Sequence, residues 1–278
     1  MSLRSCLWSD LTRDEIAEAR DQGALVVIPT GAVEQHAGHL PVGTDTTAVG
    51  HLALAAARRA SVPILVLPTV QVTFSPHHRS WPGTLTLRLE TFNALVADIT
   101  ASVEHAGFRR QLIINGHGGN RAPLGALTTE LIAAGREVGL ADYWGIAQDA
   151  IAALLHGQRK MVGHACEMET ALMLALTSGD ARALIAERAA GLPPLLASPA
   201  VRGEAGAVGR GEAWWPPIFG ADHAGYEGDP ATATLETGNA LIEAISDNLA
   251  AFYAEFMALD LRSGSVLATA PFPGPGAR

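Results

Sequence analysis

Four short apolar runs recur along the chain, and longer segments with a helical pattern separate them. The runs cover residues 24–29, 64–72, 111–115 and 140–146. A continuous apolar run of this length is typical of a strand that is buried on both faces of a sheet. Alternation of such strands with helices predicts an α/β fold whose mostly parallel central sheet is covered by helices on both sides.

The helical segments have recognisable ends. Thr12 and Glu15 have the spacing of a capping box, so a helix is expected to begin there. Thr44 or Asp45 is expected to cap the next helix, because a short polar side chain accepts hydrogen bonds from free backbone N–H groups. Residues 85–89 alternate in polarity and are predicted to form an exposed or edge strand. Further helices are predicted over residues 44–60, 89–106, 121–134, 170–176 and 235–259.

The composition supports a single large domain. Of the 278 residues, 48% are hydrophobic, which is enough for a large core without disulfides. No linker divides the chain, so residues 1–265 are predicted to form one domain and residues 266–278 a disordered tail. Residues 191–232 are rich in Gly and Pro around Trp214 and Trp215. A long irregular segment of this kind is expected to act as a lid or an oligomer contact.

Charge and targeting features narrow the functions that the chain can have. The formal net charge is −9 and the sequence has no basic stripe, which argues against binding to nucleic acid. No apolar stretch is long enough to span a membrane, and the N-terminus lacks a secretory signal. Cys6 and Cys166 are the only cysteines and make no disulfide framework, so a cytoplasmic location is expected.

Histidines and carboxylates gather in three segments, each after an apolar run or in a Gly-rich turn. These segments are Glu34–His36 with Asp45, the turn Asn115–Asn120 with His117, and His164–Glu169. In parallel α/β sheets, ligands bind beyond the carboxyl ends of the strands. Imidazole and carboxylate together suit Zn, Mn or Fe(II). The sequence therefore predicts a metal-dependent hydrolase with two divalent metal ions.

Each of these side chains also has a plainer interpretation. Glu34 and His36 are two positions apart, so an extended stretch points both to one side, but an ordinary surface loop would contain them equally well. Asp45 can cap a helix, bridge two metals, or do both. Glu167 and Glu169 can simply interact favourably with a helix dipole.

Two rival chemistries compete with a metal centre. Glycines around His117 let the backbone approach a ligand closely, and Gly116 and Gly118, followed by Gly119, suggest the start of a dinucleotide loop. That loop is excluded by spacing, because Arg121 occupies the third glycine position of G-x-G-x-x-G. Cys166 could act as a nucleophile beside a histidine, although an isolated Cys is more often a small packed hydrophobe.

Four further side chains are candidates for the pocket. His39 is expected to orient a ligand of the site. His77 and His78 precede a Trp-Pro-Gly-Thr loop and are expected to border the substrate. Trp144 is the fourth candidate.

Five segments resemble the creatininase (creatinine amidohydrolase) family. They read PTGAVEQHAGHLPVGTDT at 29–46, HRSWPGTLTL at 78–87, NGHGGN at 115–120, HACEMET at 164–170 and GDPATAT at 228–234. Together they span most of the chain in the family's order. Their coincidence makes the resemblance specific.

The resemblance implies a three-layer α/β/α fold and a ring-like homo-oligomer, often a hexamer. Position by position, it implies that Glu34 and His117 hold one metal ion, that His36 and an acid hold the other, and that Asp45 bridges them. A water or hydroxide between the metals would be the nucleophile, and the metals would stabilise the oxyanion. His164 matches the family's proton-transfer histidine, which delivers a proton to the leaving nitrogen.

Some positions depart from true creatininases. Gly119 stands where they have a Glu, and Glu167 is taken as the compensating fifth ligand because the broader family has a Glu there. Glu169 is expected nearby, beside the ligands or the substrate. Trp144 matches a family aromatic and is taken as a catalytic residue. Lys160, Gly163 and Cys166 also replace family residues, and these changes argue against creatinine itself as the substrate.

The expected reaction is hydrolysis of a C–N bond in an amide, a cyclic amide or a formamide of a small-molecule substrate. Members of the family also act on modified peptides and on oxidised sugars or inositols, the last by C–C cleavage, and these are alternatives. A catalytically inactive small-molecule-binding protein of the same fold is a further alternative. Retention of all five expected metal ligands argues against it.

Overall fold

The computed structural model describes residues 4–195 and 224–261 of the 278-residue chain. Most of the irregular segment 191–232, including Trp214 and Trp215, and the whole of the expected tail 266–278 lie outside the described residues. Among the described residues, no helix is both long enough and apolar enough to cross a membrane.

A sheet of four parallel strands forms the centre of the molecule. Thr30 at the end of one central strand pairs with Asn115, and Asn115 pairs with Asp142, so three strands end at the same level. The mostly parallel sheet that the apolar runs predict is confirmed. In spatial order the strands are β2 (Ile64–Val66), β1 (Leu25–Thr30), β3 (Arg110–Asn115) and β4 (Glu137–Asp142).

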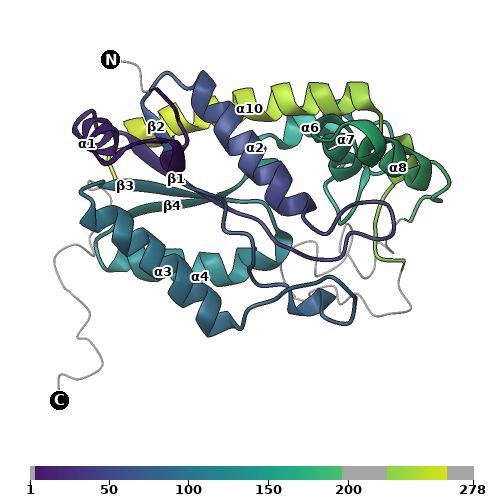
Figure 1. Ribbon diagram of the computed structural model, residues 1–278, viewed down its shortest axis with the longest axis horizontal. Helices are drawn as coiled ribbons and strands as arrows, with labels where there is room; N and C mark the ends of the chain where they lie inside the picture. The colour runs from purple at the N-terminus through teal and green to yellow at the C-terminus, as the bar shows by residue number, and fades with distance from the viewer. Residues whose placement is uncertain (1–3, 196–223, 262–278) are drawn as a thin grey trace.

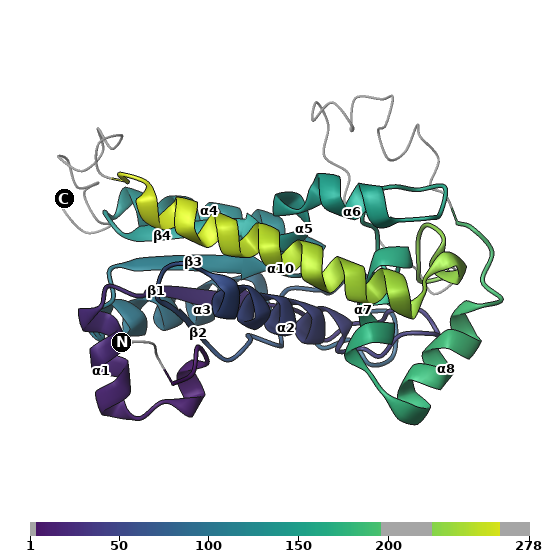
Figure 2. The ribbon, with the colours of Figure 1, turned by 90° about the horizontal axis from the view of Figure 1, so that it is seen from above.

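Helices pack on both faces of this sheet, so the fold is a three-layer α/β/α structure, as expected (Figures 1 and 2). One face carries α1 (Arg13–Asp21), α3 (Leu89–His105) and α4 (Arg121–Ala133). The other face carries α2 (Thr44–Arg59), α5 (Tyr143–Ile146), α6 (Gln148–Leu154), α7 (Glu167–Leu176) and α10 (Leu235–Ala258). The remaining elements are α8 (Gly179–Ala189) and the 3-10 helices η1 (Trp8–Asp10), η2 (Pro76–His78), η3 (Gly118–Asn120) and η4 (Pro230–Thr232).

The strands are apolar on both faces, which explains their continuous apolar runs. In β1, Leu25 and Val27 pack in the core with α2 and α10, whereas Val26 and Ile28 pack in the core with α3 and α4. All four side chains are fully buried. Burial of each such side chain contributes about 1.5–3 kcal/mol, so the sheet is held between two apolar layers.

Helix ends follow the sequence in two cases and differ in a third. The capping box of α1 is present, with the side chains of Thr12 and Glu15 each accepting a hydrogen bond from the other's backbone N–H. α3 ends just before Gly107, whose φ of 93° favours glycine. The expected cap of α2 is wrong, because the N-cap is Gly43 and no side chain caps the helix. Asp45 lies inside the first turn, where its carboxylate contacts histidines instead.

Three strand predictions are wrong in extent or kind. The strand expected over residues 64–72 ends at Val66: the Leu67 N–H still donates to Val27, but Pro29, the next β1 residue that faces this strand, has no N–H to donate back. Residues 85–89 make only isolated bridges. The run 140–146 contains the end of β4 and the whole of α5, since periodicity in a short apolar run does not separate a strand from a helical turn.

Candidate metal centre

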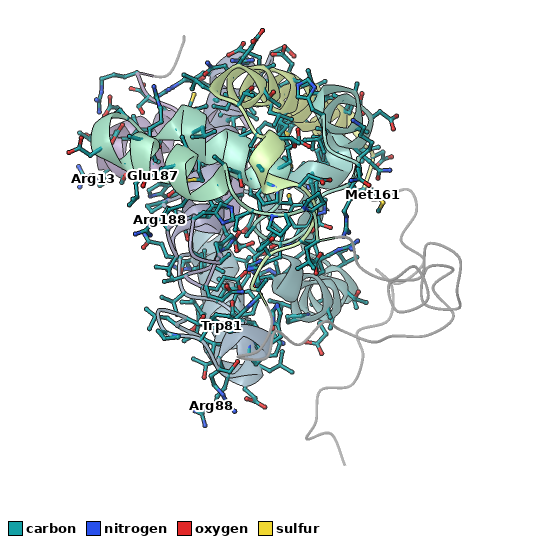
Figure 3. All side chains as sticks on the ribbon, turned by 90° about the vertical axis from the view of Figure 1, so that its right-hand side faces the viewer. Arg13, Trp81, Arg88, Met161, Glu187 and Arg188 are labelled. Atoms are coloured by element: carbon teal, nitrogen blue, oxygen red, sulfur yellow. The ribbon has the colours of Figure 1, made fainter. Side chains whose placement is uncertain are left out.

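The side chains expected at the site lie beyond the carboxyl ends of the strands. Glu34 follows β1 and His117 follows β3, while Asp45 and Glu169 come from the first turns of α2 and α7. In Figure 1 this is the right-hand end, where the loop from β1 to α2 approaches α7 and α8. Figure 3 looks onto this end of the molecule, with Met161 on one border.

Asp45 lies between two histidines, and one of its carboxylate oxygens faces each of them. Oδ1 lies 3.1 Å from Nε2 of His36, and Oδ2 lies 3.1 Å from Nδ1 of His117. All three side chains are buried. A carboxylate that divides its oxygens between two ligand groups in this way is placed to bridge two cations.

Backbone carbonyls hold the outer nitrogens of both histidines. Nδ1 of His36 lies 3.2 Å from the main-chain oxygen of Glu34, and Nε2 of His117 lies 3.2 Å from that of Phe74. Ser75 Oγ also lies 3.2 Å from Nε2 of His117. Since a carbonyl oxygen can only accept a hydrogen bond, the rings in their neutral, metal-binding form would carry their protons on these outer nitrogens. Their lone pairs then face Asp45, which is the arrangement of a metal-binding histidine.

Three imidazoles gather around one oxygen of Glu34. Its Oε1 lies 3.2 Å from Nδ1 of His117, 3.4 Å from Nε2 of His78 and 3.5 Å from Nδ1 of His164. Glu34 is 1% exposed, so these contacts form away from bulk water. Its carboxylate therefore occupies the middle of the histidine cluster.

Five imidazole rings form a continuous arc around the carboxylates. The ring centroids of His36 and His164 are 4.4 Å apart, and those of His164 and His78 are 4.3 Å apart. His78 and His77 follow at 4.3 Å, and His77 stacks on His117 at 5.5 Å with an interplanar angle of 18°. We call this series of rings the imidazole arc. It brings together histidines from four separate segments of the chain.

Glu169 faces this cluster and Glu167 does not. Oε2 of Glu169 lies 3.9 Å from Nε2 of His36. The two oxygens of Glu167 instead accept hydrogen bonds from the backbone N–H groups of His156, at 2.7 Å, and Gly157, at 2.8 Å. Both acids lie on α7, where positions two apart differ by about 200° around the axis and point to opposite sides. The structure therefore separates Glu167 from the other expected ligands and brings Glu169 to them.

The charges of the cluster fit divalent cations. Glu34 Oε2 and Glu169 Oε2 are buried and accept no hydrogen bond from any described residue, and Asp45 Oδ2 is buried beside Nδ1 of His117. Buried carboxylate oxygens are costly unless a donor or a cation satisfies them. One possible ligand group consists of Glu34, His36 and Asp45. A second consists of His36, His164 and Glu169. Within each group, the ligand atoms all lie within 4.8 Å of one another. This mixed donor set suits Zn, Mn or Fe(II).

The pKa values of His36, His117 and Glu169 are all raised in this cluster. Burial lowers the pKa of His36, but Asp45, Glu169 and Glu34 together outweigh it and raise the pKa to about 10. Burial also acts against His117, and Glu34 and Asp45 raise its pKa well above the usual value. Burial, together with the charges of Asp45 and Glu34, raises the pKa of Glu169 to about 8. Without a cation, protons therefore balance the carboxylates.

His164 is held by Gln35 beside this cluster. Its Nε2 lies 2.8 Å from the main-chain oxygen of Gln35 and 2.9 Å from Nε2 of the Gln35 side chain. Both contacts use Nε2, so Nδ1 is the ring nitrogen that faces Glu34. Burial and the neighbouring His36 lower the pKa of His164 well below its usual value, which keeps the imidazole neutral. Ala165, the next residue, has a φ of 46°, a conformation that costs a non-Gly residue about 1–3 kcal/mol.

The structure gives different contacts for two other candidates, His39 and Trp144. Nε2 of His39 lies 3.0 Å from Oγ1 of Thr170, and the ring packs edge-on against Tyr226. Burial lowers the pKa of His39 to about 4, so it is a neutral group that supports the start of α7. Trp144 is half-buried against the core near α10 and contacts Tyr143 edge-on. Its expected catalytic role stays a prediction.

The two glycines of the third segment differ sharply in their surroundings. A Cβ added to Gly118, which is exposed, would meet nothing within 4 Å. A Cβ added to Gly119 would lie 2.4 Å from Nε2 of His117, 2.6 Å from Cε1 of His77 and 2.7 Å from the main-chain oxygen of Phe74. Only Gly119 is therefore required for close packing at the cluster.

Sequence reasoning missed the residues that hold the catalytic segment in place. Gln35 lies between the expected ligands Glu34 and His36, and its side-chain nitrogen also lies 2.9 Å from Nδ1 of His78. Oδ2 of Asp229 accepts hydrogen bonds from the N–H groups of Gln158 and Arg159. The backbone N–H of Glu227 donates to the main-chain oxygen of His164. The GDPATAT segment was the only signal for this region.

Comparison with known proteins identifies the family. Residues 9–253 match the model of a protein family described as creatininase, creatinine amidohydrolase. The chain belongs to the creatininase family. The family resemblance expected from the five segments is confirmed.

The curated relatives of this creatininase-family chain are hydrolases of different specificity. It is 32% identical over 242 residues to the mycofactocin precursor peptide peptidase of Mycobacterium tuberculosis, covering 84% of this chain and 85% of the relative. It is 29% identical over 170 residues to the creatinine amidohydrolase of Pseudomonas putida, covering 55% and 64%. It is 32% identical over 109 residues to the 3-dehydro-scyllo-inosose hydrolase of Thermotoga maritima, covering 39% and 34%.

Solved creatininases share the fold. One creatinine amidohydrolase crystal structure matches 92% of this chain and 99% of its own, with a TM-score of 0.70 and 25% identity. Two others, described as a Zn-Zn type mutant creatininase and as creatininase Mn, cover the same 92% with TM-scores of 0.70 and 0.71 at 23% and 24% identity. The three-layer fold is thus that of the creatininases, and its metal-bound members carry Zn or Mn.

Proposed function

We propose that the protein is a metal-dependent amidohydrolase that cleaves a C–N bond with two divalent ions. The observation that carries this proposal is the position of Asp45, whose two oxygens face His36 and His117 separately. Glu34, Asp45 and His117 would hold one ion. His36, Asp45 and Glu169 would hold the other, so Glu169 takes the ligand role that the sequence suggested for Glu167.

The reaction would use the ions and the neighbouring histidine for different tasks. Bound divalent ions would supply an activated water and positive charge beside the developing oxyanion. Nδ1 of His164 faces Glu34 and can accept a proton from the attacking water, then pass it to the leaving nitrogen. Gln35 fixes the ring by its Nε2 side, so that Nδ1 keeps this direction. Gln35 is therefore a positioning residue.

Among C–N bonds, we place an amide of a peptide or peptide-like small molecule first. The peptidase relative supports this choice, because the similarity covers 84% of this chain and 85% of the relative. Similarity to the creatinine amidohydrolase covers 55% of the chain, and cyclic amides and formamides therefore come next. C–C cleavage of an oxidised inositol has less support, since the inosose hydrolase matches 39% of the chain.

A Cys–His amidase is disfavoured by the surroundings of Cys166. Its side chain is 2% exposed, and burial together with Glu169 raises the pKa of its thiol to about 12. A thiol in this state forms little of the nucleophilic thiolate near neutral pH.

Assembly as a ring-like homo-oligomer such as a hexamer and a cytoplasmic location remain part of the proposal.

The test compares metal-free and reconstituted protein on a defined set of amides. Metal-free protein prepared with a chelator is reloaded with Zn, Mn or Fe(II) and incubated with short peptides, cyclic amides and formamides. We expect about two ions per chain and hydrolysis only after reloading. A His164→Gln variant should keep its ions and lose activity. Equal activity before and after metal removal, or no uptake of metal, would overturn the proposal.

A further inference from the structure

We propose that His77 is a further ligand of the ion that Glu34, Asp45 and His117 would hold, and that Gly119 makes room for it. This inference rests on the proposed function and deepens it, because it concerns the same metal centre. It assigns unequal donor sets to the two ion positions.

The placement of His77 carries the first part of the inference. Glu34, His77 and His117 form a group whose ligand atoms all lie within 4.8 Å of one another. The ring of His77 stacks on that of His117 with centroids 5.5 Å apart. His77 lies in η2, a short 3-10 helix that begins at Pro76. His77 is thus the ring of the imidazole arc next to His117, which ends the arc.

His78 is adjacent in sequence but is used differently. Its Nδ1 lies 2.9 Å from the side-chain nitrogen of Gln35, and its ring stacks on His164 with centroids 4.3 Å apart. The group that contains His78 also contains Glu34 and His164, but not His117. The rings of His77 and His78 are therefore adjacent in the arc but approach different partners. His78 supports the proton-transfer side, and His77 approaches the ion position at His117.

Gly119 carries the second part of the inference. A Cβ at this position would come within 2.7 Å of the main-chain oxygen of Phe74 and within 2.4 Å of Nε2 of His117. The Phe74 oxygen is a backbone atom, and the ring of His117 is already held by the contacts of its Nε2 with Phe74 and Ser75. His77, whose Cε1 would lie 2.6 Å away, is the group that can turn aside. A glycine at 119 therefore allows His77 to stay against His117.

The consequence is a difference between the two ion positions. One position would have two imidazoles, from His77 and His117, besides its carboxylates. The other would have one imidazole, from His36, with the carboxylates of Asp45 and Glu169. Nitrogen donors favour later first-row metals, whereas a carboxylate-rich position accepts Mn more readily. The nitrogen-rich position is expected to hold Zn or Co(II) more tightly than its neighbour.

The test measures ion binding directly, apart from activity. Co(II) is titrated into metal-free protein while its visible absorption spectrum is recorded, and ions per chain are counted after dialysis against increasing chelator. The variants are His77→Ala, His77→Gln and Gly119→Ala. Gly118→Ala is the matched control for the glycine, because a Cβ there meets nothing within 4 Å. His105→Ala, at an exposed histidine of α3, is the control for the imidazole.

We expect both His77 variants and Gly119→Ala to weaken one of the two ions by about tenfold or more and to change the Co(II) spectrum of that ion. The two control variants should match the unaltered protein. Two ions bound with unchanged affinity and spectrum in His77→Ala would overturn the role of His77. An effect of His77→Ala without any effect of Gly119→Ala would overturn the role of Gly119. Failure of the unaltered protein to bind metal would instead overturn the proposed function.

Discussion

Oδ1 of Asp45 lies 3.1 Å from Nε2 of His36, and Oδ2 of the same carboxylate lies 3.1 Å from Nδ1 of His117. This one side chain joins the histidine that follows β1 to the histidine that follows β3. It does so from the first turn of α2, which is fixed against the sheet by a buried apolar face. The separation of the two proposed ion positions would therefore be set by the packing of a helix on a sheet.

Replacement of Asp45 tests the bridging role. Asp45→Asn keeps the size of the side chain but removes its charge, so both ion positions lose part of their attraction. We expect the metal content to fall below two ions per chain and the activity to fall at least about tenfold. Elemental analysis and an amide hydrolysis assay measure the two effects. Asp98→Asn, at an exposed position of α3, is the control, and equal metal loss in both variants would contradict the assignment.

Glu169 and Glu167 should respond differently to the same substitution. Glu169→Gln is expected to lower metal content and activity with little change in the folded structure. Glu167→Gln should keep its ions, because only the hydrogen bonds to the N–H groups of His156 and Gly157 are altered. Gln has one acceptor oxygen for two donors, so the free energy of unfolding should fall by about 1–3 kcal/mol.

Chemical denaturation and elemental analysis of these two variants distinguish the roles. Metal loss in Glu167→Gln with full metal retention in Glu169→Gln would reverse the assignment. Loss in both variants would mean that the turn at residues 156–157 is needed to build the centre.

The Cys166 thiol should be inert in the folded protein. Its pKa is raised to about 12 by burial, so at pH 8 nearly all of it is the unreactive thiol. We expect iodoacetamide to leave Cys166 unmodified until the protein is unfolded, as peptide mass spectrometry can measure. Cys166→Ala should retain most of the activity. Loss of activity in step with native alkylation of Cys166 would favour the thiol mechanism instead.

Metal binding should release protons and weaken as the pH falls. Asp45, Glu169 and Glu34 together overcome burial and raise the pKa of His36 to about 10, and Glu34 and Asp45 likewise raise the pKa of His117. At pH 7 both rings of the metal-free protein are therefore protonated and must lose protons to bind a cation. Calorimetry in two buffers of different ionisation enthalpy should detect about three protons released per chain, the third from Glu169, whose pKa is raised to about 8. His36→Ala should lower that number, and an unchanged number would count against this source of the protons.

The general plan of the fold could be read from the sequence because its strands are buried on both faces. Leu25 to Ile28 form an unbroken apolar run, since alternate residues contact two different helical layers. The boundary between β4 and α5 could not be predicted, because both elements lie within one apolar run and differ only in backbone conformation. Glu34 and His117 were found because they directly follow such runs.

The choice between Glu167 and Glu169 shows where sequence reasoning stops. Both acids lie in the first turn of α7, and the sequence does not reveal which side of the helix meets the cluster. The direction of each side chain depends on how α7 packs against α10 and α2, which is a tertiary property. The same holds for Gln35, which contacts His164 from a segment 129 residues away.

The imidazole arc has a practical consequence for any preparation of this protein. A row of stacked histidines around three buried carboxylates would capture Ni²⁺ or Cu²⁺ more strongly than Mn²⁺ or Fe²⁺, following the general order of divalent affinities. Passage over a nickel-charged resin would therefore load the centre with the wrong ion. Protein purified without such a resin, from cells grown with defined trace metals, is the material in which the native ion can be identified.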